Sequence, residues 1–323
     1  MRGALLEVEG LSVHFQTPEG IGRAVESVSL SIHSAETLGV VGESGCGKSV
    51  TALAVMGLVP SPPGRITAGE IRYDSRDLLK ADAETLRRLR GREISMIFQE
   101  PMTALNPVLT IGRQVAEPVM THLGASRSEA LKKAARWLDR VRIPSAKTRL
   151  KSYPHELSGG MRQRVMIAMA MICRPRLLIA DEPTTALDVT LQRQILALMA
   201  ELKSDMGTAM MLITHDLGVV AQTAGRVVVM YAGRVVESTS VERLFAKPLH
   251  PYTRGLMRSV PRLGRGSGRM IEIPGTVPAA TQPIHGCPFA DRCPEAFGRC
   301  RSQAPVLTAV SPDRWVSCWL YNQ

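Results

Sequence analysis

The hydrophobic pattern divides the chain into short apolar segments that indicate strands of two kinds. Apolar and polar residues alternate from Leu5 to Phe15 and again from Ala24 to Ile32, which predicts two half-buried β-strands. Short continuous apolar runs bounded by polar residues predict buried strands instead. These runs are Leu38–Val41, Glu93–Phe98, Leu177–Ala180, Met210–Thr214 and Arg226–Met230.

Helical spacing appears between these predicted strands. Helices are predicted at residues 49–56, 162–171 and 191–203. Ser126 and Glu129 form an S-x-x-E capping box, and apolar residues follow it at helical spacing. The alternation predicts an α/β domain with a mainly parallel sheet, carrying a helix-rich insertion at about residues 100–170.

The composition of the chain changes after about residue 261. Residues 263–268 read Leu-Gly-Arg-Gly-Ser-Gly, which is typical of a flexible linker. The sequence beyond is rich in Pro, Cys and Gly and has little periodicity. We therefore predict one domain at 1–262 and a second region at 263–323, a small irregular Cys-rich appendage that a bound metal could stabilise.

Bulk composition narrows the classes of function. The chain has 323 residues and 45% hydrophobic content, enough for a packed core, and its N-terminus does not look like a signal peptide. No apolar run approaches the length of a membrane span, so we expect a soluble, cytosolic protein. The net charge is +11, but the arginines are scattered and aromatic residues make up only 4%. This argues against nucleic-acid binding and favours a basic surface near anionic lipid or a nucleotide.

The segment after the strand at Leu38–Val41 carries the clearest chemical signal. It fits the pattern G-x-x-x-x-G-K-[ST] at every fixed position and leads into a predicted helix. Glycines allow backbone N–H groups to approach an anion, and the helix start adds further donors. Lys48 would reach the β- and γ-phosphates and the Ser49 hydroxyl would ligate Mg²⁺. The residues of this phosphate loop are Gly42, Glu43, Ser44, Gly45, Cys46, Gly47, Lys48 and Ser49.

Two further segments offer chemistry that a phosphate-binding protein could use. The strand at Leu177–Ala180 ends in Asp181 and Glu182, which suit a Mg²⁺ ligand and a general base; a solvated acidic turn is the alternative. The octet from Leu157 to Arg164 starts a helix with Ser158, Gly159 and Gly160, which could meet a second anion or could form an ordinary capped glycine turn.

The octet resembles the signature of ABC transporter ATPases, and that resemblance extends along the chain. It implies a P-loop NTPase fold with a RecA-like core, an antiparallel β-subdomain and an inserted helical subdomain. Gln99 matches the family's metal-contacting glutamine, and Asp188, with Ala186 and Leu187, matches the loop that crosses between paired ATPases. His215 matches the histidine that contacts the γ-phosphate. Phe15 lies where the family stacks a ring on adenine, although it could equally be a core aromatic residue.

The resemblance also implies how the site is divided between chains. Two ATPases would close head to tail, so that Ser158, Gly159 and Gly160 of one chain face the phosphate loop of the other. ATP would be held by Phe15, the phosphate loop and Thr51, and Mg²⁺ by Ser49, Gln99 and Asp181. Catalysis would rest on Lys48, Glu182 and His215.

Three segments resemble the ATPases of dipeptide and oligopeptide importers, of the dipeptide permease type: residues 99–107, 250–256 and 286–293. This implies an ATPase that powers peptide uptake from the cytoplasmic face of the membrane. Its partners would be a paralogous ATPase, two permease subunits and, indirectly, an external binding protein. A nickel or other small-solute importer of the same architecture remains an alternative, as does a soluble ABC ATPase.

The cysteines gather near the C-terminus. Cys287, Cys293, Cys300 and Cys318 have the spacing C-x₅-C-x₆-C-x₁₇-C, wider than the close pairs of structural zinc sites. Together with the resemblance, this favours a [4Fe–4S] cluster over zinc or free thiols. Cys46 stands where such loops more often carry Ser or Thr, and we expect alkylation of its thiol to block ATP hydrolysis.

Overall fold

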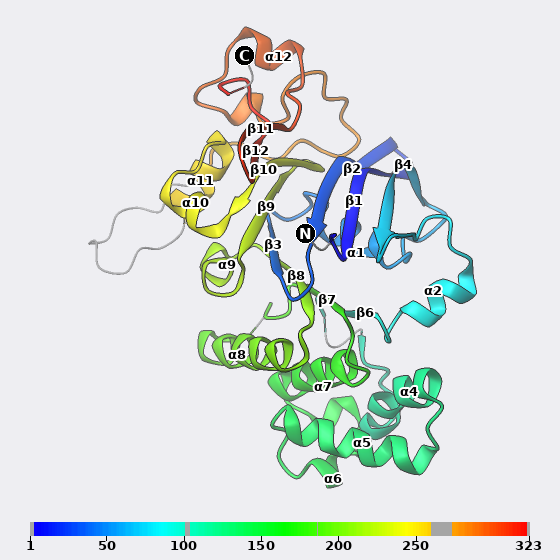
Figure 1. Ribbon diagram of the computed structural model, residues 1–323. Helices are drawn as coiled ribbons and strands as arrows, with labels where there is room; N and C mark the ends of the chain where they lie inside the picture. The colour runs from blue at the N-terminus through cyan, green and yellow to red at the C-terminus, as the bar shows by residue number, and fades with distance from the viewer. Residues whose placement is uncertain (1–2, 101–103, 186, 260–272, 322–323) are drawn as a thin grey trace. The chain divides into compact units, whose positions relative to one another are not determined.

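The structure is a computed structural model that describes residues 3–100, 104–185, 187–259 and 273–321 (Figure 1). The chain forms two compact units. Unit 1 takes its described residues from the ranges 1–32, 37–79 and 213–323, and unit 2 from 33–36 and 80–212. Each unit is described by itself below.

Unit 1 contains a sheet of antiparallel strands at the N-terminal part of the chain, blue to cyan in Figure 1. The strand order is β2-β1-β4-β5. Val8, Leu11 and Val13 of β1 are buried, while polar residues between them are more exposed. The two alternating segments of the sequence are therefore strands, as predicted. The bounds are β1 (Leu6–Thr17), β2 (Gly20–Ile32), β4 (Gly64–Tyr73) and β5 (Arg76–Asp77).

A second group of strands in unit 1 mixes parallel and antiparallel pairs. Their order is β11-β12-β10-β9-β3, in which β3 and β9 are parallel and the remaining neighbours are antiparallel. The sheet is thus mixed, whereas we expected it to be mainly parallel. The bounds are β3 (Thr37–Val41), β9 (Arg226–Tyr231), β10 (Arg234–Ser240), β11 (Thr308–Ser311) and β12 (Arg314–Val316).

The helices of unit 1 are short, with the longest, α11, spanning nine residues. They are α1 (Lys48–Val55), α9 (Leu217–Thr223), α10 (Val241–Ala246), α11 (Pro251–Ser259) and α12 (Gly298–Ser302), with a 3₁₀ turn η2 (Ala290–Arg292).

An aromatic cluster lies in the core of unit 1. The ring centroids of Tyr231 and Tyr252 are 4.7 Å apart, and Phe289 lies 5.2 Å from the first and 5.5 Å from the second. All three side chains are fully buried, and Cys287 and Cys293 pack against the same core. Burial of an aromatic ring stabilises the folded state by several kcal/mol, at about 25 cal/mol per Å² of apolar surface. Phe289 comes from the C-terminal segment, residues 273–321, so this segment is part of the core of unit 1.

The prediction of a separate irregular appendage at the C-terminus is therefore not supported. Strand β12 pairs with β10, with Glu237 opposite Val316 and Ser238 opposite Trp315. The sequence pattern missed these strands because β12 has three residues and β11 four, too short for periodicity to show. The predicted linker and the domain boundary at 262 lie outside the described residues, and the boundary stays a prediction.

Unit 2 combines a small sheet with a set of helices. Strands β8, β7 and β6 lie side by side in that order, and β6 runs parallel to β7, with Ile94 opposite Leu177. The strands are β6 (Ile94–Ile97), β7 (Leu177–Asp181) and β8 (Ala209–Thr214), whose residues up to 212 belong to unit 2. The helices are α2 (Ala83–Leu89), α4 (Ile111–Leu123), α5 (Arg127–Arg140), α6 (Ala146–Arg149), α7 (Gly159–Met171) and α8 (Val189–Met206), with a 3₁₀ turn η1 (Pro154–Glu156).

The predicted helix-rich insertion is present as α4 to α7. The capping box that starts α5 is formed: the Glu129 carboxylate accepts from the backbone N–H of Ser126 at 2.9 Å, and Ser126 Oγ accepts from the N–H of Glu129 at 3.3 Å. Ala134 and Leu138 are fully buried on the inner face of α5. None of the helices in the described part of the chain is long and apolar enough to cross a lipid bilayer.

A buried ion pair joins β10 to β12 and tests the integration of the C-terminal segment. The fully buried carboxylate of Glu237 accepts from Arg314 Nη2 at 2.8 Å and from the N–H groups of Leu249 (3.0 Å) and His250 (2.9 Å). Arg314→Ala would leave the carboxylate buried without its cation. We expect a loss of about 3–5 kcal/mol in the free energy of unfolding, measured by denaturant titration.

The matched control for this variant is Arg301→Ala, in the same segment. Arg301 pairs with Asp291 at 3.1 Å, but both side chains are mostly exposed, so the loss should stay below about 1 kcal/mol. Equal stability of Arg314→Ala and the native protein would contradict an integrated C-terminal segment.

Candidate functional site

The phosphate loop of unit 1 connects β3 to α1 and is shaped by close backbone approaches. A Cβ atom on Gly47 would lie 2.4 Å from the carbonyl oxygen of Ala24, and one on Gly42 would lie 2.2 Å from that of Met230. Gly47 also has φ of +96°, in the left-handed region, and is the N-cap of α1. The first turn of α1 contains no acidic residue, so its N–H groups and its dipole favour an anion at this end.

Lys48 folds back over the loop. Its side chain is 4% exposed, and Nζ donates to the carbonyl oxygens of Gly42 at 2.8 Å and Glu43 at 2.9 Å. The carbonyl oxygens of the loop therefore hold the ammonium group in place. This arrangement places a fixed positive charge in a phosphate-binding loop.

The other predicted ligands of the loop lie in the first turn of α1. Ser49 is half-buried there. Thr51 is buried, and its hydroxyl donates to the carbonyl oxygen of Gly47 at 2.9 Å, so its observed contact supports the loop. The predicted contact of Thr51 with the α-phosphate stays a prediction.

Cys46 is not an accessible thiol. Its side chain is fully buried, and Sγ lies 3.7 Å from Lys48 Nζ. Burial raises the pKa of this thiol, against an opposing effect of Lys48. A thiol with a raised pKa has less thiolate at neutral pH, so the structure disfavours the ready alkylation that we expected.

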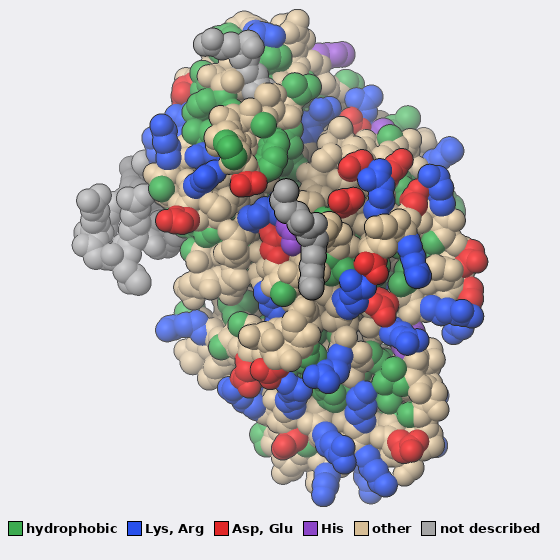
Figure 2. Space-filling model, in the orientation of Figure 1, with side chains coloured by type: hydrophobic (Ala, Val, Ile, Leu, Met, Phe, Trp, Pro, Cys, Tyr) green, Lys and Arg blue, Asp and Glu red, His purple; other side chains and the backbone are tan. Residues whose placement is uncertain are grey.

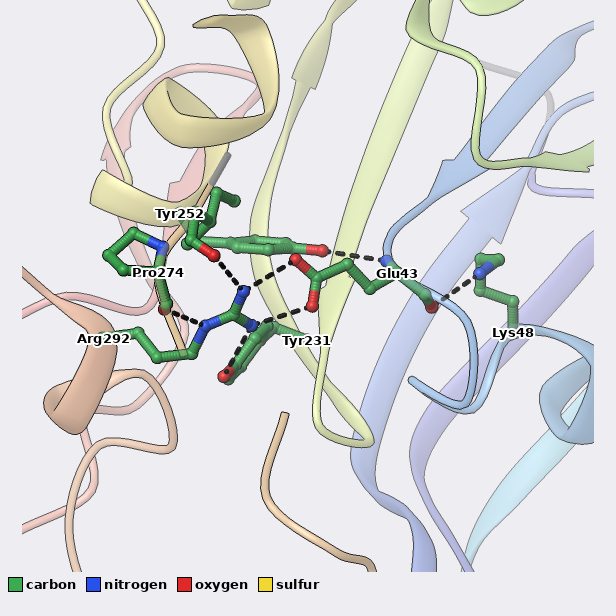
Figure 3. Close-up of polar contacts among 7 residues, drawn as sticks. Glu43, Lys48, Tyr231, Tyr252, Pro274 and Arg292 are labelled. Atoms are coloured by element: carbon green, nitrogen blue, oxygen red, sulfur yellow. Dashed lines mark hydrogen bonds and ion pairs between the residues drawn. The ribbon is translucent and has the colours of Figure 1, made fainter. Parts of the chain in front are cut away.

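Residues far along the chain hold Glu43 in place (Figure 3). Its backbone N–H donates to Tyr252 Oη at 2.9 Å, and its carboxylate forms an ion pair with Arg292 at 2.8 Å. We assigned Glu43 to the phosphate loop from the sequence but missed these two partners. Arg292 lies in the run between Cys287 and Cys293, and no periodicity or spacing links it to a residue 249 positions earlier.

In unit 2, the two carboxylates lie at the end of β7, as predicted. Asp181 is the last residue of β7 and is 5% exposed. Glu182 comes next, with φ of +45°, a conformation that a non-glycine residue adopts at a cost and that is common at functional sites. Gln99 Nε2 donates to the Glu182 carboxylate at 3.2 Å, and Thr185 Oγ1 donates to it at 2.8 Å. The structure thus brings together Gln99 and Glu182 and orients the carboxylate.

The segment Ser158-Gly159-Gly160 starts α7. Ser158 Oγ accepts from the N–H of Met161 at 3.4 Å and caps the helix. A Cβ atom on Gly160 would lie 2.6 Å from Leu191 Cδ2, so a larger residue there would require the Leu191 side chain on α8 to move. A Cβ atom on Gly159 would have no neighbour within 4 Å among the described residues. Packing within the described chain therefore explains Gly160 but not Gly159.

The remaining predicted residues have defined places. Asp188 caps α8, accepting from the N–H groups of Thr190 at 3.0 Å and Leu191 at 2.9 Å, while Ala186 lies outside the described residues. His215 is exposed directly after β8. Phe15, on β1, is half-buried with its ring against Gly64. The roles of Asp188, His215 and Phe15 in binding or catalysis stay predictions.

The four C-terminal cysteines do not form a site for a single metal ion. No group of three or more His, Cys, Asp or Glu side chains in the described part of the chain is arranged to hold one. The thiols are nevertheless near enough to affect one another: burial raises the pKa of Cys287 to about 11, and Cys318, Cys300 and Cys293 add smaller effects in the same direction. Cys300 and Cys318 are each 8% exposed.

A phosphate loop before a short helix, with an oriented carboxylate after a buried strand, defines a nucleotide-binding protein of the P-loop class. Residues 25–185 match the family described as "ABC transporter", and residues 236–300 match "Oligopeptide/dipeptide transporter, C-terminal region". The chain belongs to the ABC transporter family, in the group that carries this C-terminal region.

Curated relatives and solved structures agree with this assignment. A probable peptide ABC transporter ATP-binding protein of Sinorhizobium fredii is 55% identical over 99% of this chain and 96% of its own length. The oligopeptide transport ATP-binding protein OppD of Salmonella typhimurium is 51% identical over 98% of this chain and 93% of its own length. A solved dimeric ATP-binding cassette in a post-hydrolysis state, bound to ADP and Pi, has a TM-score of 0.66 at 28% identity and covers 73% of this chain and 98% of its own.

Proposed function

We propose that this protein is the ATP-hydrolysing subunit that powers the import of di- or oligopeptides through a membrane ABC permease. The observation that carries this proposal is the pair of matches along the chain, to the ABC transporter family and to the oligopeptide/dipeptide transporter C-terminal region. Relatives about half identical over nearly the whole chain are described as peptide transport ATP-binding proteins, which supports the peptide class of solute.

Nucleotide binding would rest on the phosphate loop and α1. Lys48 and the backbone N–H groups of the loop would bind the phosphates of ATP, and Phe15 would contact the adenine ring. Ser49, Gln99 and Asp181 offer hydroxyl, amide and carboxylate oxygens, ligand types that Mg²⁺ prefers. When bound, Mg²⁺ would help Lys48 to neutralise the charge that develops on the γ-phosphate.

Hydrolysis would use Glu182 as general base. Its carboxylate accepts hydrogen bonds from Gln99 and Thr185, which would keep it aimed at one point and ready to take a proton from the attacking water. We propose that His215 contacts the γ-phosphate and helps to align that water. The left-handed conformation of Glu182 supports a functional position.

A second chain would complete each site. We propose that Ser158, Gly159 and Gly160 meet the γ-phosphate held by a paralogous partner ATPase, with Asp188 near the crossing between the two chains. The start of α7 suits an anion, and the open space beside Gly159 supports a close approach from outside the chain.

The permease contact would be made by the loop between β6 and α4. The buried amide of Gln114 supports this loop: its Oε1 accepts from the N–H of Asn106 at 2.8 Å, and its Nε2 donates to the carbonyl oxygens of Asn106 and Leu109. The loop presents Val108, which is 76% exposed. An exposed apolar side chain beside this hydrogen-bonded stretch at residues 106–109 could contact a protein partner.

We place the protein at the cytoplasmic face of the membrane, bound to two permease subunits and indirectly served by an external binding protein. Figure 2 shows Lys and Arg side chains gathered over the helices α4 to α7 of unit 2. The exposed basic residues of α5 include Lys132 and Arg140. Such a surface favours the neighbourhood of anionic lipid.

We also propose that Cys287, Cys293, Cys300 and Cys318 hold a structural [4Fe–4S] cluster. The support for this proposal is the resemblance of the C-terminal run to importer ATPases, together with four thiols near enough to affect one another. The cluster would stabilise the C-terminal fold and would take no part in the hydrolysis of ATP.

The test of the function is Glu182→Gln in a complex reconstituted with its permease subunits. We expect ATP affinity within about threefold of the native value and ATP turnover lowered at least about 100-fold, because the base is lost. Phosphate release and uptake of a labelled dipeptide are measured together. The control is Glu201→Gln, a change of the same type in an exposed pair with Arg142.

Near-normal turnover in Glu182→Gln would reject the base assignment. If the native complex took up nickel but no peptide, the protein would belong to a nickel importer instead of a peptide importer. Failure of the native chain to co-purify with any permease would favour a soluble ABC ATPase.

Val108→Asp tests the permease contact. A buried carboxylate at an interface is costly, so we expect the permease recovered with the tagged variant to fall about tenfold or more. The thermal unfolding temperature should not change, because Val108 is exposed. Val306→Asp is the control, at a valine that is 69% exposed in unit 1. Full permease recovery with Val108→Asp would place the contact elsewhere.

The cluster is tested by iron and acid-labile sulfide assays on anaerobically purified protein. We expect four of each per chain and a loss of both in Cys287→Ser. The absence of iron and sulfide from the native protein would reject the cluster, and zinc in their place would favour the other metal.

A further inference from the structure

Arg292 contacts the phosphate loop through a two-point ion pair. It ends the turn η2, and its side chain is 7% exposed. Nη1 donates to Oε2 of Glu43 at 2.8 Å, and Nη2 donates to Oε1 at 3.1 Å. This parallel geometry is the strong form of a guanidinium–carboxylate pair, and it fixes direction as well as distance.

The other N–H groups of Arg292 are also used. Nε donates to the carbonyl oxygen of Pro274 at 2.9 Å, Nη1 to Tyr231 Oη at 3.3 Å and Nη2 to the carbonyl oxygen of Ile273 at 3.1 Å. The five hydrogen bonds match the five donors of a guanidinium group. A lysine has three donors at one point and could not reproduce this set.

Two aromatic rings lie near the guanidinium group of Arg292. Arg292 Cζ lies 5.7 Å from the ring centroid of Tyr231 and 5.9 Å from that of Phe289. Although burial opposes the charged form, the hydrogen bonds that Arg292 donates to Glu43 and Tyr231 raise its pKa further above the usual value. The charge is permanent, and the apolar surroundings weaken its screening by salt.

Glu43 connects Arg292 to Lys48. Its N–H is bound by Tyr252 Oη, its carboxylate by Arg292, and its carbonyl oxygen accepts from Lys48 Nζ at 2.9 Å. Three separate parts of the chain therefore hold the one residue that follows the first glycine of the loop. Figure 3 shows this line of contacts from Arg292 through Glu43 to Lys48.

We propose that Arg292 is a positioning residue for ATP: by holding Glu43, it keeps the phosphate loop and Lys48 in the conformation that binds the phosphates. The C-terminal segment thereby sets the nucleotide affinity of the protein. This inference rests on the proposed function of the loop in binding ATP. Its specific claim is that a residue outside the loop's own sequence pre-organises it, so that less ordering is needed when ATP binds.

The competing explanation is an ion pair that only stabilises the fold. The two explanations predict different effects on the unfolding temperature and on the KM for ATP. A pair that only stabilised the fold would alter the unfolding temperature and leave the KM for ATP unchanged. Loss of positioning would raise the KM and the nucleotide dissociation constant together, with a smaller effect on kcat.

The test uses the full chain carrying Arg292→Lys, Glu43→Gln or both changes. KM and kcat of ATP hydrolysis, the affinity for a fluorescent ATP analogue and the unfolding temperature are measured for each. We expect KM and the dissociation constant to rise about tenfold in each single variant, with kcat within about twofold. The KM and the dissociation constant of the double variant should be about equal to those of the more impaired single variant, because both changes remove the same contact.

The matched control is Arg301→Lys, in the same segment, whose exposed pair with Asp291 does not touch the loop. We expect it to behave as the native protein. If Arg292→Lys fails to fold, Glu43→Gln carries the test, since Glu43 is 27% exposed and tolerates change more readily.

Three outcomes would overturn the inference. They are an unchanged KM in both single variants, a multiplication of their effects in the double variant, and an equal rise in KM in Arg301→Lys. A native protein that neither binds nor hydrolyses ATP would instead reject the proposed function, and the inference with it.

Discussion

The structure depends on a constraint that a phosphate-binding loop cannot meet by itself. The loop must offer backbone N–H groups to an anion, so most of its residues have small or no side chains and give it few contacts of its own. Gly42 and Gly47 lie against backbone carbonyl groups that leave no room for a Cβ atom. Neighbouring elements therefore supply the rigidity, through the backbone of β2 and β9 and through the ion pair of Glu43 with Arg292.

In unit 2, too, neighbouring residues hold a predicted site residue in place. Glu182 has a left-handed conformation that costs free energy, and hydrogen bonds from Gln99 and Thr185 hold its carboxylate. Ser158 and Asp188 stabilise the starts of α7 and α8, because their side-chain oxygens accept hydrogen bonds from N–H groups of the first turn. Residues predicted to bind or to catalyse thus also stabilise the local structure. The stability of a variant at such a residue therefore has to be measured together with its activity.

Much of the fold could be predicted because its signals are local. The alternation in β1 and β2, the capping box of α5 and the loop between β3 and α1 each depend on residues close in sequence. The predictions that failed involve distant parts of the chain. The C-terminal segment is not a separate appendage, because β12 pairs with β10 and Phe289 enters the core of unit 1. The burial of Cys46, which disfavours its alkylation, also could not be predicted from a loop motif, and the effect of alkylation on ATP hydrolysis stays a prediction.

The sequence by itself determined the residues of the phosphate loop, because the spacing of that motif is fixed, and the resemblance of several motifs to ABC transporter ATPases indicated the family. Only the tertiary structure decided what holds that loop. The contact of Arg292 with Glu43 spans 249 positions, and neither residue departs from its local pattern. The packing of Tyr231, Tyr252 and Phe289 brings the two charges together beside apolar side chains, where screening by water is weaker than at an open surface.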